Sequence, residues 1–189
     1  MSGRVFSKPA IFRSAKFYQE VDFGNATFTE DADFSDAEFY KSVRFDDAKF
    51  LKAAIFSSTK FGIIKPAAAI VTSEIGPPVL WIDKWADAIG RPERGKQVPY
   101  LVVQGSFWRS KFHGIANFRS AEFAGAARFI NTEFLTEKAD FPSAQFRGPS
   151  EFIGAKFLQG ADFQGVKFTD QASFYQSEFH GRKSLHRIA

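Results

Sequence analysis

The stretch ADFSDAEFYKSVRFDDAKF, residues 32–50, decides the fold, because its phenylalanines recur after five, six and five residues. They are Phe34, Phe39, Phe45 and Phe50. An amphipathic helix repeats every ~3.6 residues and a strand every two, so neither element alone explains this rhythm. The same alternation extends over most of the chain, and an internal repeat of this kind determines the architecture.

All 25 phenylalanines of the 189-residue chain belong to this repeat, in which a single seven-residue interval, from Phe134 to Phe141, departs from the alternation of five and six. They stand at residues 6, 12, 17, 23, 28, 34, 39, 45, 50, 56, 61, 107, 112, 118, 123, 129, 134, 141, 146, 152, 157, 163, 168, 174 and 179. The residue two positions before each Phe is usually Ala and otherwise Val, Thr, Ser or Gly, with Arg4 as the exception. Because residues i and i+2 of a strand point to the same side, each unit predicts a three-residue strand, Ala-x-Phe, with Ala and Phe facing inward.

Short and long corners alternate between these predicted strands. A five-residue interval leaves two corner residues, of which the second is mostly Ser, Asn, Asp or Gly, the residues that accept tight turns. The outward middle residues are often charged, and at a spacing of 22 or 23 residues their signs alternate, as in Lys111, Glu133, Lys156 and Glu178. At a spacing of eleven residues, Glu122 would lie beside Glu133. Opposite charges on neighbouring strands stabilise a sheet, so the pattern favours four-sided coils of about 22 residues over two-sided coils of about eleven.

The units ADF, ANF, AEF and AKF place Ala two positions before Phe, and in this respect the chain resembles the pentapeptide-repeat proteins. It is similar to a Phe-rich variant in which five- and six-residue units alternate, over residues 6–61 and 107–179. The resemblance implies an all-β solenoid, a right-handed four-sided (quadrilateral) β-helix, with one extruded α/β insert. We therefore expect residues 1–189 to form a single β-helix domain whose coils, 6–61 and 107–179, are interrupted by the insert 62–106 and followed by a C-terminal tail, 180–189.

The insert preserves the phase of the repeat, because the 46-residue interval from Phe61 to Phe107 exceeds a six-residue interval by forty residues. Within it, residues 77–90 (PPVLWIDKWADAIG) predict a short helix that begins at a Pro pair and ends at a Gly. Residues 68–73 and 99–104 predict flanking strands. The apolar face of the helix either packs on the β-helix or binds a partner. Its residues are the candidate partner-binding residues: Leu80, Trp81, Trp85 and Ile89.

Composition and motifs disfavour enzymatic chemistry. The absence of cysteine excludes disulfides and thiol catalysis. His113, His180 and His186 lack the companion spacing of a metal site or a catalytic base, so we predict no catalytic, cofactor-binding or metal-binding residue, and no cofactor. A net charge of +4 indicates mixed surface charge, and makes nucleic acid an unlikely ligand. We expect a soluble cytoplasmic protein without a signal peptide, a membrane span or a small-molecule substrate.

Three functions are compatible with these features. The first is a non-enzymatic scaffold that binds a protein partner through its faces, its ends or the insert. The second follows from the resemblance: some pentapeptide-repeat proteins resemble duplex DNA in shape and charge and bind type II topoisomerases such as DNA gyrase, but this requires an acidic surface and is disfavoured here by a pI of ≈ 9.3. The third is an enzyme with its site in the insert. In addition, the open ends of a β-helix expose strand edges, which predicts a homodimer through one end.

Overall fold

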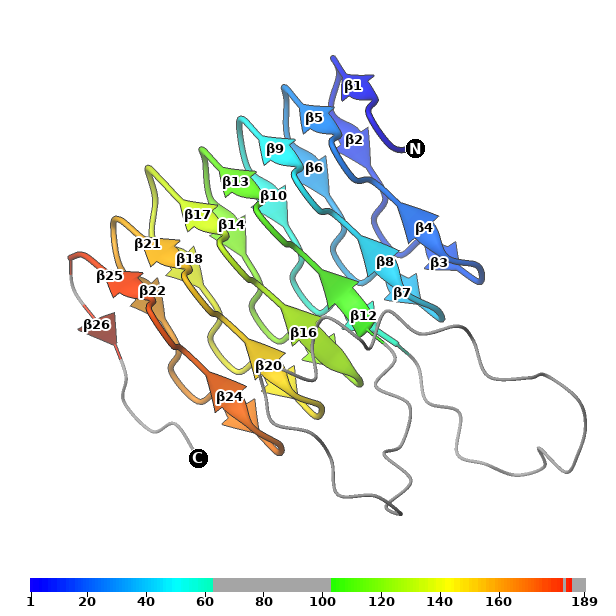
Figure 1. The fold of residues 1–189 in the computed structure, drawn as a ribbon. Helices are drawn as coiled ribbons and strands as arrows, with labels where there is room; N and C mark the ends of the chain where they lie inside the picture. Colours follow the sequence, from blue (N-terminus) through cyan, green and yellow to red (C-terminus); the bar gives the residue numbers. More distant parts are fainter. Residues whose placement is uncertain (63–102, 182, 185–189) are drawn as a thin grey trace, which may run out of the picture. The chain divides into compact units, whose positions relative to one another are not determined.

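The computed structural model describes residues 1–62, 103–181 and 183–184, and these residues belong to one compact unit (Figure 1). This part of the chain contains no helix. Its short strands wind in coils of about 22 residues, over about six turns, and each coil contributes one strand to each of four parallel sheets. The prediction of a four-sided all-β solenoid is therefore confirmed. The predicted helix 77–90 and the strand 68–73 lie outside the described residues.

We name the sheets A to D in the order in which a coil passes through them. Sheet A consists of β1 (Val5–Phe6), β5 (Thr27–Phe28), β9 (Lys49–Phe50), β13 (Lys111–Phe112), β17 (Glu133–Phe134), β21 (Lys156–Phe157) and β25 (Glu178–Phe179). Sheet B consists of β2 (Ala10–Ile11), β6 (Ala32–Asp33), β10 (Ala54–Ile55), β14 (Ala116–Asn117), β18 (Ala139–Asp140), β22 (Ala161–Asp162) and β26 (Lys183–Ser184). Sheet C consists of β3 (Lys16–Phe17), β7 (Glu38–Phe39), β11 (Lys60–Phe61), β15 (Glu122–Phe123), β19 (Gln145–Phe146) and β23 (Lys167–Phe168). Sheet D consists of β4 (Val21–Asp22), β8 (Val43–Arg44), β12 (Val103–Ser106), β16 (Ala126–Arg128), β20 (Ser150–Glu151) and β24 (Ala172–Ser173).

The side chains of the core form four columns of stacked phenylalanine rings, one column behind each sheet. Within a column the centroids of successive rings are 4.4 Å apart for Phe61 and Phe123 and 5.5 Å apart for Phe39 and Phe61, the shortest and longest of these spacings. Rings of different columns meet at angles from 35°, between Phe129 and Phe134, to 90°, between Phe152 and Phe163. These offset-stacked and edge-to-face contacts are the arrangements that aromatic rings prefer. All phenylalanines are therefore used in packing the interior, as the repeat predicts.

The two-residue corners join sheet B to sheet C and sheet D to sheet A, and we call these corners the B–C edge and the D–A edge. The second residue of every such corner has a positive φ, which confirms the predicted tight turns. These residues are Ser14, Asn25, Asp36, Asp47, Ser58, Arg109, Ser120, Asn131, Ser143, Gly154, Gly165 and Gln176. Each turn is closed by a hydrogen bond from the backbone N–H of the following small residue to the carbonyl of the preceding Phe, as from Ala15 to Phe12 at 3.0 Å.

The same hydrogen bond makes the strands shorter than predicted. Most strands contain two residues instead of the three in Ala-x-Phe. After a short corner the N–H of the Ala position is used inside the turn, as in Ala15, so the strand consists of the middle residue and Phe. Before a short corner the strand consists instead of the Ala position and the middle residue. Turn closure therefore competes with the sheet for this backbone donor.

The strands on either side of residues 63–102 pair in the register of the repeat. Strand β12 pairs with β8 before it and with β16 after it, and Phe107 stacks on Phe45 with centroids 5.1 Å apart. Strand β12 begins at Val103, inside the segment 62–106 that the sequence assigns to the insert. The register of β12 against β16 shifts between Val103 and Gly105, at the start of this strand in sheet D.

The register also confirms the alternation in sign that was predicted for Lys111, Glu133, Lys156 and Glu178 in successive coils. Lys111 pairs with Glu133, Glu133 with Lys156, and Lys156 with Glu178. At the C-terminal end, β26 lies within the predicted tail 180–189 and pairs with β22. The first and last coils have a neighbouring coil on one side only, which leaves their outer strand edges unpaired within the described residues.

The columns predict that a phenylalanine between two rings contributes more to stability than one at the end. We expect Phe56→Ala to lower the free energy of unfolding by about 3–5 kcal/mol, because its ring is fully buried between two others. The same change at Phe12, a partly exposed member of the same column, should cost clearly less. Denaturant unfolding monitored by circular dichroism measures both, and equal losses would contradict the prediction.

Gln176 is predicted to be a strained corner residue. A residue with a Cβ in the left-handed region costs roughly 1–2 kcal/mol, and Gln176 has a φ of 56°. We therefore expect Gln176→Gly to raise the free energy of unfolding by about 1 kcal/mol. Gln164→Gly is the matched control, since Gln164 occupies a short corner without a positive φ, and it should be neutral or destabilising. A loss of stability in Gln176→Gly would refute the strain.

Candidate interaction surfaces

The candidate partner-binding residues predicted from the sequence, Leu80, Trp81, Trp85 and Ile89, lie outside the described residues. Their roles remain predictions. The described residues instead offer surfaces at the corners and on the outer faces of the sheets. Since each coil repeats the last, a side chain at one corner position is followed by the side chain at the same position one coil later. Exposed residues of one kind therefore form rows along the solenoid.

The C–D edge, formed by the long corners that join sheet C to sheet D, carries a pair of tyrosines. The rings of Tyr18 and Tyr40 are stacked with centroids 4.8 Å apart, and Tyr18 is 60% exposed. One coil later the same corner position is Gly62, whose N–H bonds to the carbonyl of Phe39 at 2.8 Å. Gly62 is also the last residue that the structure describes before residue 103. The tyrosine pair therefore lies on the same edge as Gly62.

Next to this pair, Glu38 joins three neighbours on the outer face of sheet C. Its carboxylate accepts a hydrogen bond from the Tyr40 hydroxyl at 2.9 Å and lies 3.5 Å from Lys16 Nζ and 3.3 Å from Lys60 Nζ. The hydrogen bond from Tyr40, together with the two ammonium groups, holds the pKa of Glu38 below its usual range. This cluster links the sheet C strands β3, β7 and β11 of three successive coils.

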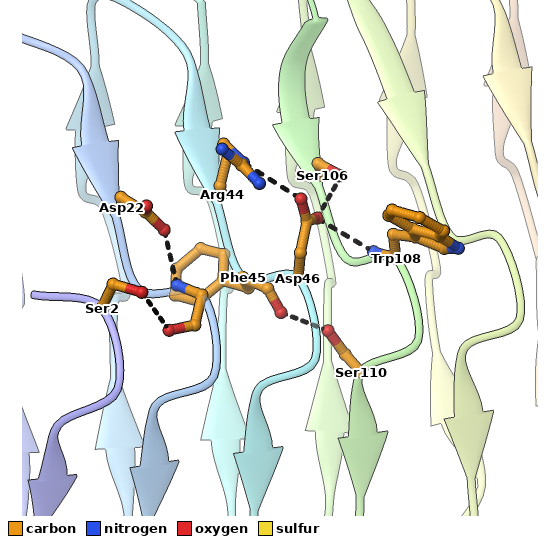
Figure 2. A network of polar contacts seen from close by, with 9 residues as sticks. Ser2, Asp22, Arg44, Phe45, Asp46, Ser106, Trp108 and Ser110 are labelled. Carbon is orange, nitrogen blue, oxygen red and sulfur yellow. Dashed lines mark hydrogen bonds and ion pairs between the residues drawn. The ribbon is translucent and has the colours of Figure 1, made fainter. Parts of the chain in front are cut away.

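The D–A edge is polar in its first coils (Figure 2). Asp46, which is buried, forms an ion pair with Arg44 at 3.0 Å and accepts hydrogen bonds from the Ser106 hydroxyl and from the Trp108 N–H. The Ser110 hydroxyl, which belongs to the same coil as Ser106 and Trp108, donates a hydrogen bond to the carbonyl of Phe45 in the preceding coil. These bonds attach the chain that follows residues 63–102 to the coil that precedes them. We interpret the network as structural, since the donors of Ser106, Trp108 and Ser110 all bond to acceptors of the preceding coil.

From Trp108 onward the first residue of each corner on the same edge is apolar or aromatic, whereas the second residues include the polar Arg109, Asn131 and Gln176. The first corner residues of four successive coils are Trp108, Ile130, Ile153 and Tyr175. Backbone hydrogen bonds place these corners one above the other, as from Arg109 N–H to the carbonyl of Ile130 at 2.9 Å. Trp108 is 46% and Tyr175 67% exposed, whereas the two isoleucines are partly exposed. The corresponding positions of the B–C edge are Arg119, Pro142 and Gln164 in the later coils.

This apolar row was not predicted from the sequence, although a signal for it exists. The row has the spacing of 22 or 23 residues that identifies the coil, and each of its members directly follows a Phe of sheet D. The prediction from the sequence compared charged middle residues of strands at this spacing and did not compare corner residues. Corner residues are usually assumed to be polar because most turns are solvated, which hides a row of this kind.

Asp140 on sheet B illustrates how the corners use outward carboxylates. Asp33 and Asp162 accept a hydrogen bond from the N–H two residues later, at 2.9 Å in both cases. For Asp140 this position is Pro142, which has no N–H, and its Oδ1 is buried without a hydrogen bond. Lys138, which lies in the seven-residue interval between Phe134 and Phe141, places its ammonium group 3.1 Å from that oxygen and 3.2 Å from Asp162. Asp140 thus pairs with Lys138 because Pro142 supplies no N–H donor. No bound ligand is needed to account for this carboxylate.

Within residues 1–62, 103–181 and 183–184, no group of three or more His, Asp or Glu side chains is arranged to hold a metal ion. In the same part of the chain, no helix is long and apolar enough to cross a membrane.

The fold and its repeat agree with a comparison against known families. A family model described as pentapeptide repeats matches residues 3–49, 107–148 and 141–187, with nine copies. These matches cover more than half of the chain, so the chain belongs to the pentapeptide-repeat family. No curated protein and no solved structure matched the chain.

The Glu38 cluster predicts a pH-dependent contribution to stability. Because the pKa of Glu38 is lower in the folded state, its contribution is present above the unfolded pKa of about 4.3 and is lost as the pH falls through the folded value. We expect Glu38→Gln to be less stable than the native protein by up to about 1 kcal/mol at pH 7, and this difference to shrink as the pH falls below about 4. Denaturant unfolding at several pH values tests this, with exposed Glu20→Gln as the control. A difference that persists at low pH would contradict it.

Proposed function

We propose that the protein is a non-enzymatic scaffold that binds a protein partner on its outer surface. The observation that carries this proposal is the complete use of the phenylalanines in the four ring columns, where the rings of the inner coils are fully buried. An interior filled in this way leaves no space for a ligand in the described part, so recognition takes place on faces, edges and ends. Repeat proteins characteristically present such surfaces to other proteins.

The C–D edge is the best candidate for the partner site. It combines the exposed Tyr18, stacked on the partly exposed Tyr40, with a cluster of charged side chains. Tyrosine and other aromatic residues are enriched at the centres of protein interfaces. The insert 62–106 begins on this edge, one coil after Tyr40. We therefore retain Leu80, Trp81, Trp85 and Ile89 as partner-binding residues that act together with the tyrosine pair.

The alternative of a DNA mimic that binds a topoisomerase receives no support from the charges. Outward carboxylates are paired with lysine or arginine in all four sheets, as in the ion pairs Arg13–Asp33, Lys60–Glu38, Lys111–Glu133 and Arg128–Glu151. Such pairing neutralises the row of negative charge that would imitate phosphates. A homodimer through one end and a cytoplasmic location remain predictions.

Capture experiments from a lysate of the native host test the scaffold and locate its site. The intact protein is compared with a variant that lacks residues 65–104, which keeps a three-residue corner and the phase of the repeat, and with Tyr18→Ser/Tyr40→Ser. We expect a specific protein to be captured by the intact chain and lost from both variants. Tyr175→Ser, an exposed tyrosine on another edge, should retain it.

Thermal unfolding of each variant confirms that the solenoid is intact. Capture of the same protein by all four chains would assign binding to another surface and refute the C–D edge. The absence of any specifically captured protein would refute the scaffold itself.

A further inference from the structure

The outer surface of sheet A has a repeated composition over its last four coils (Figure 1, strands β13, β17, β21 and β25). Along its centre runs a charged row, consisting of Lys111, Glu133, Lys156 and Glu178. Along one side runs the D–A row, consisting of Trp108, Ile130, Ile153 and Tyr175. Along the other side runs the A–B row, the first residues of the long corners to sheet B, consisting of His113, Leu135, Leu158 and His180.

Hydrogen bonds establish that the A–B row is aligned in the same way as the D–A row. The N–H of Leu135 bonds to the carbonyl of Phe112, and that of Leu158 to the carbonyl of Phe134, both at 3.0 Å. Both leucines are partly exposed. Each of the four coils therefore presents one apolar or aromatic residue, one charge, and one Leu or His, in that order across the face.

The order of the four coils is mirrored about the middle of the face. The two central coils both present Ile and Leu around a charge, and the charges are opposite, Glu133 and Lys156. The two outer coils both present an aromatic residue and His around a charge, and these charges are also opposite, Lys111 and Glu178. Consider two copies that face each other across a two-fold axis perpendicular to the solenoid axis. Each coil of one copy then lies opposite the mirrored coil of the other. Each position of the three rows named above therefore meets a compatible one.

No other face in the described residues combines a row of alternating charges with apolar, aromatic or His residues along both sides. Sheet C also alternates in sign, from Lys16 through Glu38 and Lys60 to Glu122, and this pattern supports ion pairs within the chain. Its B–C edge, however, consists of polar corners such as Ser35. On sheet A the pattern also ends abruptly, because Lys49 pairs with Lys111, a like charge. Alternation alone thus serves the fold, whereas the apolar rows beside it call for a separate explanation.

We propose that this face of sheet A is the interface of an antiparallel homodimer. In it, Lys111 of one protomer lies opposite Glu178 of its partner, Glu133 lies opposite Lys156, and the isoleucines and leucines meet their counterparts. A slip by one coil brings Lys111 opposite Lys156 and Glu133 opposite Glu133. A parallel arrangement sets each charge opposite itself. Like charges across an interface oppose association, so the charged row selects the antiparallel register.

The size of the face determines how strong the association is. Four coils at about 4.8 Å each give a contact only about 19 Å long. An interface of this length belongs to the small class, below about 1,200 Å² in total, whose members are weak and reversible. We therefore expect a monomer–dimer equilibrium that depends on protein concentration. Sheet C and the C–D edge lie on the far side of the coil from sheet A and remain accessible in both protomers.

Sedimentation velocity on a charge-swapped pair of full-length proteins tests the register. In Lys111→Glu the new charge faces Glu178 of the partner, and in Glu178→Lys it faces Lys111, at two symmetric places in each dimer. Each variant alone should dimerise about tenfold more weakly than the native protein. An equimolar mixture of the two should regain native-like association, because opposite charges face each other again in the mixed dimer.

The same change on the opposite face is the control. Lys167→Glu on sheet C should dimerise as the native protein does. The proposal is overturned if the native protein stays monomeric at its highest soluble concentration, if the mixture associates no better than the separate variants, or if Lys167→Glu weakens the dimer to the same extent. An association through the ends of the β-helix would leave Lys111→Glu unaffected, since β13 lies in the interior of its sheet, and this result also overturns the proposal.

Discussion

The stacking of phenylalanine rings between successive coils is the constraint on which the rest of the structure depends. A ring can stack only if the coil below places another ring at the same point, so every coil must have nearly the same length and the same four corners. The five- and six-residue intervals satisfy this requirement. The seven-residue interval before Phe141 shows how it is maintained: the extra residue is accommodated in a long corner, and Phe141 still stacks on Phe118 at 4.8 Å.

The small residue before each Phe follows from the same constraint. With four rings in each coil, the interior has room for Ala but seldom for a larger side chain. Where Ser or Thr takes this position after a short corner, its hydroxyl remains satisfied: Thr132 donates to the carbonyl of Phe107 at 2.6 Å and Thr59 to that of Phe34 at 2.7 Å. The polar atoms thus enter the core without an unpaired donor, which keeps their burial inexpensive.

A solenoid built in this way converts sequence spacing into surface rows. The outward residue of each strand and the residues of each corner recur once per coil, so that charges, aromatic residues and aliphatic residues form lines along the axis. The tyrosines of the C–D edge and the apolar rows beside sheet A arise from this geometry. The C–D edge does not border sheet A. A dimer through sheet A would therefore carry two C–D edges, and a partner with two binding sites would gain affinity from both.

Much of this fold was accessible from the sequence because the repeat is local and its period is visible. The Phe positions determined the inward face, the alternating intervals determined the corners, and the charges at a spacing of about 22 residues selected four sides over two. Only the tertiary structure decided the lengths of the strands, since hydrogen bonds closing the turns compete with the sheets for the same N–H groups. It also decided the conformation of Arg109 and Gln176, whose types do not favour a positive φ. The apolar row from Trp108 to Tyr175 is a property of coils stacked in register, because residues 22 or 23 positions apart become neighbours only when the solenoid forms.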